Sequence, residues 1–76
     1  MKEKLLKMLR GINSDINYDS EKSLVENGIF DSLEIMQIVV GIEEKFDIEI
    51  EPDDIIPENF DSVDAMLRLI EKIGKE

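Results

Sequence analysis

One long segment with a very wide apolar face constrains the fold of this chain more than any other feature. Residues 31–47 read "DSLEIMQIVVGIEEKFD", and at about 100° per residue their apolar side chains fill an arc of about 220° of a helix. One neighbouring helix covers a much narrower stripe, so several neighbours are needed. The apolar residues are Leu33, Ile35, Met36, Ile38, Val39, Val40, Ile42 and Phe46, and the polar arc holds Glu34, Gln37, Gly41, Glu44 and Lys45. We therefore predict a central helix over residues 32–46 that leaves a narrow acidic stripe in solvent.

Weaker periodic patterns lie on both sides of this helix. Residues 2–12 and 61–73 carry apolar side chains at helical spacing, and Gly74 follows the second of them as a stop signal. Residues 13–30 are mostly polar with scattered apolar anchors, which indicates a long ordered loop. The stretch "FDIEIEP" alternates like a strand but has no partner strand, so we expect an extended connector. A short third helix is predicted at about residues 53–57, ended by Pro57.

The length of the chain limits the number of domains. A chain of 76 residues with 42% hydrophobic residues can build one small core. We predict a single domain over residues 1–76 that is all-α, a small antiparallel four-helix bundle with a long first loop and a short third helix. Met36, Val40 and Met66 are expected to pack in the core, with a lipid pocket lined by them as the alternative.

The absence of some residue types excludes several chemistries. The chain contains no cysteine and no histidine, which rules out disulfides, structural zinc and catalysis by either residue, and favours an intracellular, cytoplasmic setting. No stretch approaches the roughly 20 apolar residues of a membrane span, so no membrane insertion is expected. No glycine-rich phosphate loop is present, and we predict neither catalytic nor metal-binding residues. We also expect the protein to be a monomer.

The net charge of −10 is concentrated in the middle of the chain. Residues 31–58 contain ten acidic residues and one basic residue, Lys45, which gives −9, whereas residues 1–11 carry +3. Such a field repels nucleic acid and anionic lipid and accelerates encounter with a basic protein. We expect a protein partner with a basic face and no binding to nucleic acid. The alternative that remains open is that the acidity serves only to keep the protein soluble.

Two nearly identical phrases, "FDSLEIMQI" and "FDSVDAMLRL", start at residues 30 and 60. In each phrase an aspartate is followed three residues later by an acid, Asp31 by Glu34 and Asp61 by Asp64. This spacing is typical of a capping box, in which an aspartate accepts hydrogen bonds from the first amides of a helix. Both phrases are therefore predicted to start helices.

The serine of the first phrase has the more favourable surroundings for a modification. Ser32 follows the long loop, and its hydroxyl would lie beside unpaired amides of the helix N-terminus, where a phosphodiester is tolerated. Ser62 and Ser20, the latter in a third Asp-Ser pair, are expected to be ordinary polar residues.

Residues 27–50, "NGIFDSLEIMQIVVGIEEKFDIEI", resemble the core of the acyl carrier and peptidyl carrier proteins. The resemblance implies that phosphopantetheine is covalently attached to Ser32, between Asp31 and Leu33, by a separate magnesium-dependent phosphopantetheinyl transferase that uses coenzyme A. It also implies a stand-alone carrier, with no catalysis of its own, that holds an acyl or aminoacyl group as a thioester. An activating ligase would load the carrier, and a downstream acyltransferase or synthase would receive the group.

The resemblance also suggests which residues contact partners. Glu34, Glu43 and Glu44 match the acids with which the family binds basic patches on its enzymes, and this would give Glu43 a reason to fall inside the apolar arc. Gln37 stands where fatty-acid carriers typically have another acid, so the chain looks closer to carriers of single amino acids, such as the D-alanyl carrier proteins.

Two other interpretations account for parts of the sequence. Residues 47–58 have carboxylates at EF-hand positions, but Pro52 occupies the position at which a calcium loop needs glycine, which argues against calcium. The second is an acidic helical adaptor that binds basic proteins without being modified, with Ser32 only part of a helix cap.

Overall fold

The computed structural model describes residues 1–18, 20 and 22–74, and within them the chain forms α-helices and one 3-10 turn but no strand. The α-helices are α1 (Lys2–Ile12), α2 (Ser32–Phe46), α3 (Pro57–Phe60) and α4 (Val63–Gly74), and the 3-10 turn is η1 (Pro52–Asp54). The bounds of α1 and α2 are those that apolar periodicity predicts. The predicted all-α bundle with a long first loop and a short third helix is confirmed.

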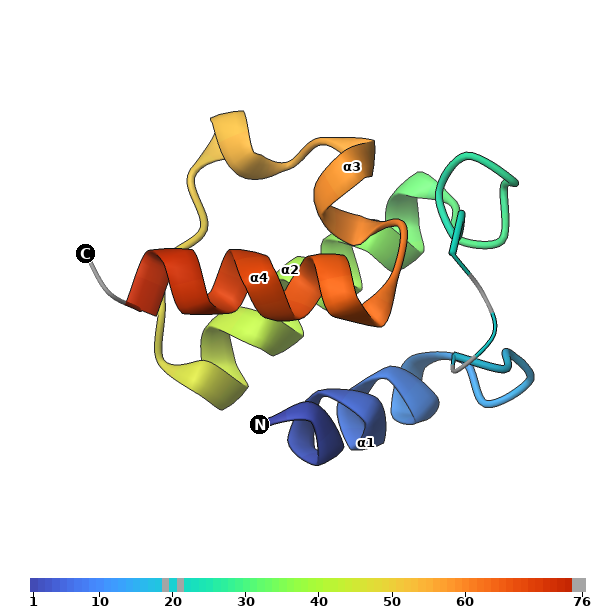
Figure 1. Ribbon diagram of the computed structural model, residues 1–76, viewed down its shortest axis with the longest axis horizontal. Coiled ribbons are helices and arrows are strands. Elements are labelled where there is room, and N and C mark those ends of the chain that lie inside the picture. Colours follow the sequence, from blue (N-terminus) through green and yellow to red (C-terminus); the bar gives the residue numbers. More distant parts are fainter. Residues whose placement is uncertain (19, 21, 75–76) are drawn as a thin grey trace.

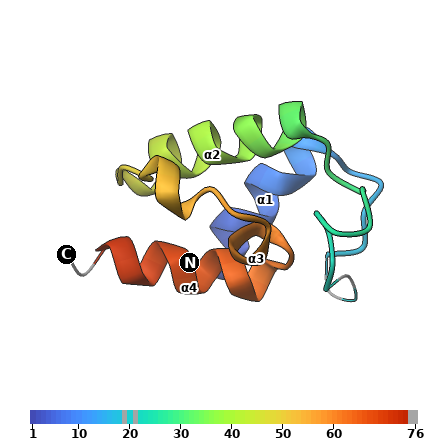
Figure 2. The ribbon, with the colours of Figure 1, turned by 90° about the horizontal axis from the view of Figure 1, so that it is seen from above.

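Helix α1 packs against both α2 and α4, while α3 packs against the start of α4. In Figures 1 and 2, α1 runs opposite to α2 and α4, and the connector after α2 crosses back over the bundle to α3. The largest fully buried side chains come from all four α-helices and the first loop: Leu5, Leu9, Leu24, Ile38, Ile42, Phe60 and Met66. One core therefore joins the helices to the first loop.

The expectation that the whole apolar arc of α2 is covered is wrong. Ile38, Val39 and Ile42 are buried, but Leu33, Met36 and Val40 are 68%, 49% and 47% exposed. The neighbouring elements cover only one side of α2, so an arc of about 220° exceeds what they can bury. The solvent side of α2 is consequently apolar as well as acidic, and of the three residues expected in the core only Met66 is buried there.

The predicted third helix at residues 53–57 is also wrong in its bounds. The chain forms η1 at Pro52–Asp54 and then α3 at Pro57–Phe60, so Pro57 begins a helix instead of ending one. Proline suits the first helical position because the amide that it lacks has no partner there anyway. Before η1 the connector is extended, as expected, and it buries Ile50.

The start of the last helix differs from the prediction of a helix over residues 61–73. Helix α4 begins at Val63, and the Ser62 hydroxyl accepts a hydrogen bond from the Ala65 amide at 3.1 Å, so Ser62 caps it. Asp61 is not the cap: its carboxylate accepts hydrogen bonds from the Val25 and Glu26 amides of the first loop. Gly74, expected as the stop, is the last residue of the helix.

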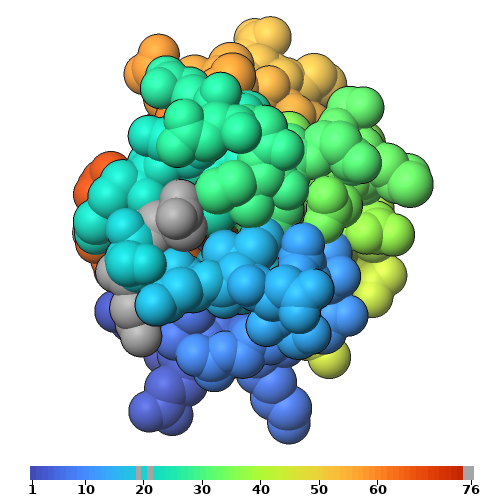
Figure 3. All heavy atoms as spheres, turned by 90° about the vertical axis from the view of Figure 1, so that its right-hand side faces the viewer, coloured from blue at the N-terminus to red at the C-terminus, as the bar shows by residue number. Residues whose placement is uncertain are grey.

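The long first loop is fixed by buried side chains. The Tyr18 hydroxyl is directed at the carbonyls of Leu9 and Asn13, at 3.0 and 2.7 Å, and its ring lies 6.3 Å from that of Phe30. Leu24 and Phe30 are buried in the same core. Figure 3 shows the described part of this loop covering one side of the molecule, next to the first turn of α2.

Candidate functional site

Ser32 is the first residue of α2, and its position is set by a capping box. The Glu34 amide donates to Asp31 Oδ1 at 2.8 Å, and the Asp31 amide donates to Glu34 Oε1 at 3.4 Å. These reciprocal bonds satisfy two amides that a helix start otherwise leaves unpaired. The capping box predicted for the first phrase is therefore present, and it places Ser32 at the exposed end of a 15-residue helix.

The surroundings of Ser32 suit a covalently bound phosphodiester. Ser32 is exposed, and within the described chain its hydroxyl makes no hydrogen bond. The positive end of the α2 dipole and the unpaired amides of its first turn favour a negative group at this position. A phosphate ester on the Ser32 oxygen can therefore project into solvent without breaking a contact of the fold.

A small apolar pocket opens beside Ser32. Its volume is about 220 Å³, and it is enclosed by the first loop, α2, the connector and α3. The lining residues are Val25, Ser32, Ile35, Met36, Ile55, Ile56, Pro57 and Phe60. Because no charged side chain lines it, this pocket can shelter a small apolar group but not an ammonium group.

The exposed side of α2 carries a continuous apolar strip, which we define as Leu33, Met36 and Val40. The strip borders a shallow groove of about 440 Å³ between α1 and α2, with Gln37 and Glu44 also at the groove. Apolar side chains ringed by polar ones are typical of protein contact surfaces. Sequence reasoning missed this strip, although the excessive width of the apolar arc was a signal for it.

The predicted partner-binding residues, Glu34, Gln37, Glu43 and Glu44, are not equivalent in the structure. Glu44 and Gln37 are exposed, as a partner contact requires. Glu34 is half-buried and also accepts a hydrogen bond from the Asn13 side chain at 3.3 Å, whereas half-buried Glu43 accepts one from the Ile50 amide at 3.0 Å. Both Glu34 and Glu43 therefore make hydrogen bonds within the fold. The bond to the Ile50 amide explains why Glu43 lies inside the apolar arc of α2.

The other two serines lie in different settings. Ser62 caps α4, and exposed Ser20 donates to the Asn17 carbonyl at 3.3 Å, while Asp19 of the third Asp-Ser pair lies outside the described residues. Ser32 is the first residue of a helix, and its hydroxyl makes no hydrogen bond within the described residues. Ser62 and Ser20 have neither property, because each hydroxyl is hydrogen-bonded and neither residue is the first of a helix.

Two further findings concern metals and membranes. The described residues hold no group of three or more acidic side chains placed to bind a metal ion, and none lies at the calcium-like segment 47–58. Among the helices that the structure describes, none has the length and apolar character that a membrane span needs.

Comparisons with known proteins show what the chain is similar to. Residues 4–70 match the family model described as "Phosphopantetheine attachment site". The chain is 27% identical over 74 residues to Aminoacyl carrier protein 1 of Bradyrhizobium diazoefficiens, covering 92% of this chain and 81% of that protein. It is 24% identical over 62 residues to the D-alanyl carrier protein of Lactobacillus acidophilus, covering 82% of this chain and 78% of that protein. No solved structure gives a significant match.

Proposed function

Since the chain belongs to the phosphopantetheine attachment family and is a carrier, not an enzyme, we propose that Ser32 bears the arm and that the protein delivers an aminoacyl group on it. The observation that carries the proposal is the exposed Ser32 hydroxyl at the first position of α2, free of hydrogen bonds within the described chain. Asp31 would hold the helix start in place, and Leu33 would flank the arm.

The attachment is a phosphoryl transfer in which Ser32 supplies the nucleophile. Its hydroxyl oxygen forms a bond to the pantetheine-bearing phosphorus of coenzyme A, the diphosphate P–O bond breaks, and adenosine bisphosphate leaves. The hydroxyl proton passes to a base of the phosphopantetheinyl transferase, because no titratable side chain among the described residues is hydrogen-bonded to Ser32 and the nearby carboxylates of Asp31 and Glu34 accept from backbone amides. When bound, the arm supplies a thiol that holds a cargo as a thioester.

The cargo that we propose is a single amino acid. Both relatives are named as carriers of aminoacyl or D-alanyl groups, and Gln37 is neutral where fatty-acid carriers typically have an acid. The small pocket beside Ser32 would not enclose the ammonium group of such a cargo, which would stay in solvent.

The partner surface that we propose is the apolar strip with exposed Gln37 and Glu44 beside it. It would meet the transferase, an adenylate-forming ligase and a downstream acyltransferase or synthase in turn, with the carrier monomeric and in the cytoplasm. An acidic side chain near an apolar patch favours fast encounter with a basic enzyme and short-lived complexes.

The test of attachment is the intact mass after incubation with coenzyme A, Mg²⁺ and a broad-specificity phosphopantetheinyl transferase. We expect one phosphopantetheine on the parent, Ser20→Ala and Ser62→Ala proteins, and none on Ser32→Ala. No mass gain on the parent would support the unmodified adaptor instead, and a gain on Ser32→Ala would assign the arm to another residue.

The test of cargo uses the modified protein. Incubation with an amino-acid-activating ligase, its amino acid and ATP should add one aminoacyl group, and treatment with hydroxylamine should remove it, as expected for a thioester. A fatty-acyl ligase serves as the comparison, and loading only by that enzyme would overturn the aminoacyl proposal.

A further inference from the structure

The carboxylate of Asp61 binds the loop that precedes Ser32, although the two segments are far apart in sequence. Asp61 Oδ1 accepts hydrogen bonds from the Val25 amide at 2.9 Å and the Glu26 amide at 3.2 Å. The Asp61 carbonyl accepts a third from the Leu24 amide at 2.8 Å. Three successive loop amides thus donate hydrogen bonds to one residue at the junction of α3 and α4. Two of these bonds go to a carboxylate, which makes them stronger than bonds to a neutral acceptor.

This contact is transmitted along the chain to Ser32. The Phe30 amide donates to the Leu24 carbonyl at 3.0 Å and closes a turn over residues 24–30, within which the Gly28 amide donates to the Val25 carbonyl. Gly28 has a φ of 71°, which favours glycine. Phe30 is buried and directly precedes Asp31, the cap of α2. Asp61 therefore fixes one end of a turn whose other end sets the start of α2.

The outer side of the same turn is available to a partner. Glu26, Asn27 and Gly28 are exposed, and Figure 3 shows this part of the loop next to the beginning of α2. A transferase that reaches the Ser32 hydroxyl approaches this surface as well. If the turn were not held, it would have to be ordered during binding, which weakens association.

We propose that Asp61 is a positioning residue for the modification of Ser32: it holds the turn 24–30 in the conformation that the phosphopantetheinyl transferase binds. The proposal rests on the proposed function, because it presupposes that Ser32 is the attachment residue. Asp61 acts through the turn and touches neither Ser32 nor the transferred group.

The test compares three variants by transferase kinetics and amide exchange. Asp61→Ala should raise the KM of the carrier roughly tenfold, with kcat within about twofold, because binding then includes ordering of the turn. The Val25 and Glu26 amides should exchange faster in the same variant. Asp61→Asn keeps an oxygen that can accept both hydrogen bonds but loses the charge that strengthens them, so its KM should lie between those of the parent and Asp61→Ala.

The matched control is Ser62→Ala, which removes the cap of α4 one residue away but leaves the loop contacts intact. Its KM should equal that of the parent. Overturning results are an equal KM increase in Ser62→Ala, or faster exchange in Asp61→Asn or Asp61→Ala without any change of KM. Asp61→Asn alone decides the question if Asp61→Ala does not fold. An unmodified parent, or a modified Ser32→Ala, would instead refute the proposed function itself.

Discussion

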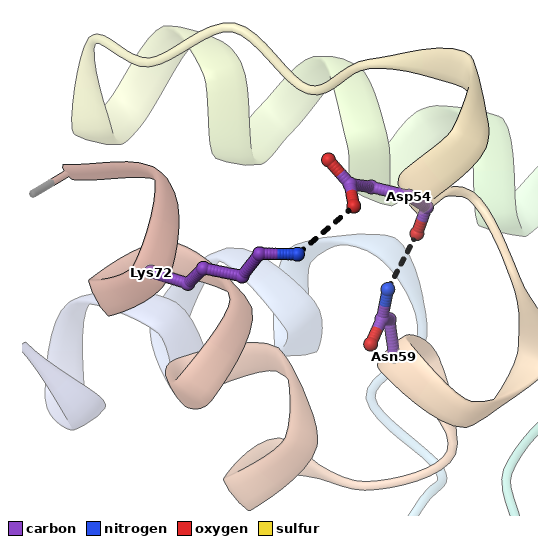
Figure 4. Close-up of polar contacts among 3 residues, drawn as sticks. All are labelled: Asp54, Asn59 and Lys72. Carbon is purple, nitrogen blue, oxygen red and sulfur yellow. Dashed lines mark hydrogen bonds and ion pairs between the residues drawn. The ribbon is translucent and has the colours of Figure 1, made fainter. Parts of the chain in front are cut away.

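The side chain of Glu43, near the end of α2, accepts a hydrogen bond from the backbone amide of Ile50 at 3.0 Å. Ile50 is buried and the hydrogen bond itself is partly buried, so little water reaches this amide to replace the carboxylate. The contact joins α2 to the extended connector. A second set of contacts lies at Asp54 of η1 (Figure 4). The Asp54 carboxylate forms an ion pair with the Lys72 ammonium at 3.4 Å, and the Asp54 carbonyl accepts a hydrogen bond from the Asn59 side chain at 2.7 Å.

Replacing Glu43 should therefore destabilise the fold. Glu43→Ala leaves the buried Ile50 amide unpaired and should lower the free energy of unfolding by about 1–3 kcal/mol, while Glu43→Gln keeps an acceptor and should cost less. The adjacent, exposed Glu44→Ala is the control and should change stability by no more than about 0.5 kcal/mol. Urea titrations report these values, and equal midpoints for the two alanine variants would contradict the role of Glu43.

Truncation of two methionines should cost very different amounts of stability. Met66 is fully buried, so Met66→Ala should lower the free energy of unfolding by about 2–5 kcal/mol, whereas Met36, which is 49% exposed, should lose about 0.5 kcal/mol or less. Met66→Leu keeps most of the volume and should remain folded even if the alanine variant does not. Thermal unfolding followed by circular dichroism distinguishes them, and a large loss in Met36→Ala would place that residue in the core.

Charge reversal should separate folding from docking. Glu34→Lys removes the acceptor used by the Asp31 amide and the Asn13 side chain, so we expect a loss of stability of about 1 kcal/mol. Glu44→Lys should leave stability unchanged and slow loading by a basic ligase, with the slowing reduced at high salt. Initial loading rates at two ionic strengths test this, and an unchanged rate for Glu44→Lys would mean that Glu44 does not face the ligase.

The stability of the protein should depend on Tyr18 at alkaline pH. Burial raises the pKa of the Tyr18 phenol above its usual value of 10.0, the negative charge of Glu34 adds to the increase, and Arg10 opposes it. The folded state thus holds this proton more tightly, and the stabilisation is present below pH 10 and lost as the pH rises through the folded-state pKa.

The comparison with Tyr18→Phe isolates this effect from the titration of lysines. Near neutral pH the variant lacks the hydrogen bonding to Leu9 and Asn13 and should be less stable by about 0.5–1.5 kcal/mol. The difference between parent and variant should shrink above the usual tyrosine pKa of about 10. Urea unfolding across this pH range measures it, and a constant difference would show that the Tyr18 pKa is the same in both states.

Periodicity was sufficient for the long helices and insufficient for their surroundings. The bounds of α1 and α2 follow from local patterns and from the Asp31 cap, which depend on neighbouring residues in the chain. The exposure of Leu33 and Val40 could not be predicted in this way, because it depends on how many neighbours pack against α2. Pro57 was ambiguous for a related reason, since proline both ends and begins helices.

The candidate site shows the same division. Ser32 could be selected from the sequence because its cap, its loop and its resemblance to a family are all local features. The hydrogen-bond partners of Asp61 could not be predicted from the sequence, because only the tertiary fold brings the Val25 and Glu26 amides to its carboxylate. An aspartate before a helix is usually a cap, and only the structure shows that Ser62 caps α4 here.

Hydrogen bonds hold the first turn of α2 on two sides. One joins Glu34 to Asn13 at the end of α1, and others join the turn before α2 to Asp61 at the start of α4. A group attached at Ser32 therefore swings about a fixed pivot, and the volume that it sweeps is set by its own length and by the surface that blocks one side. Local concentration of a cargo near a bound enzyme then depends on where that enzyme sits relative to the pivot. An enzyme whose active site lies outside the swept volume can be reached only if the whole carrier turns.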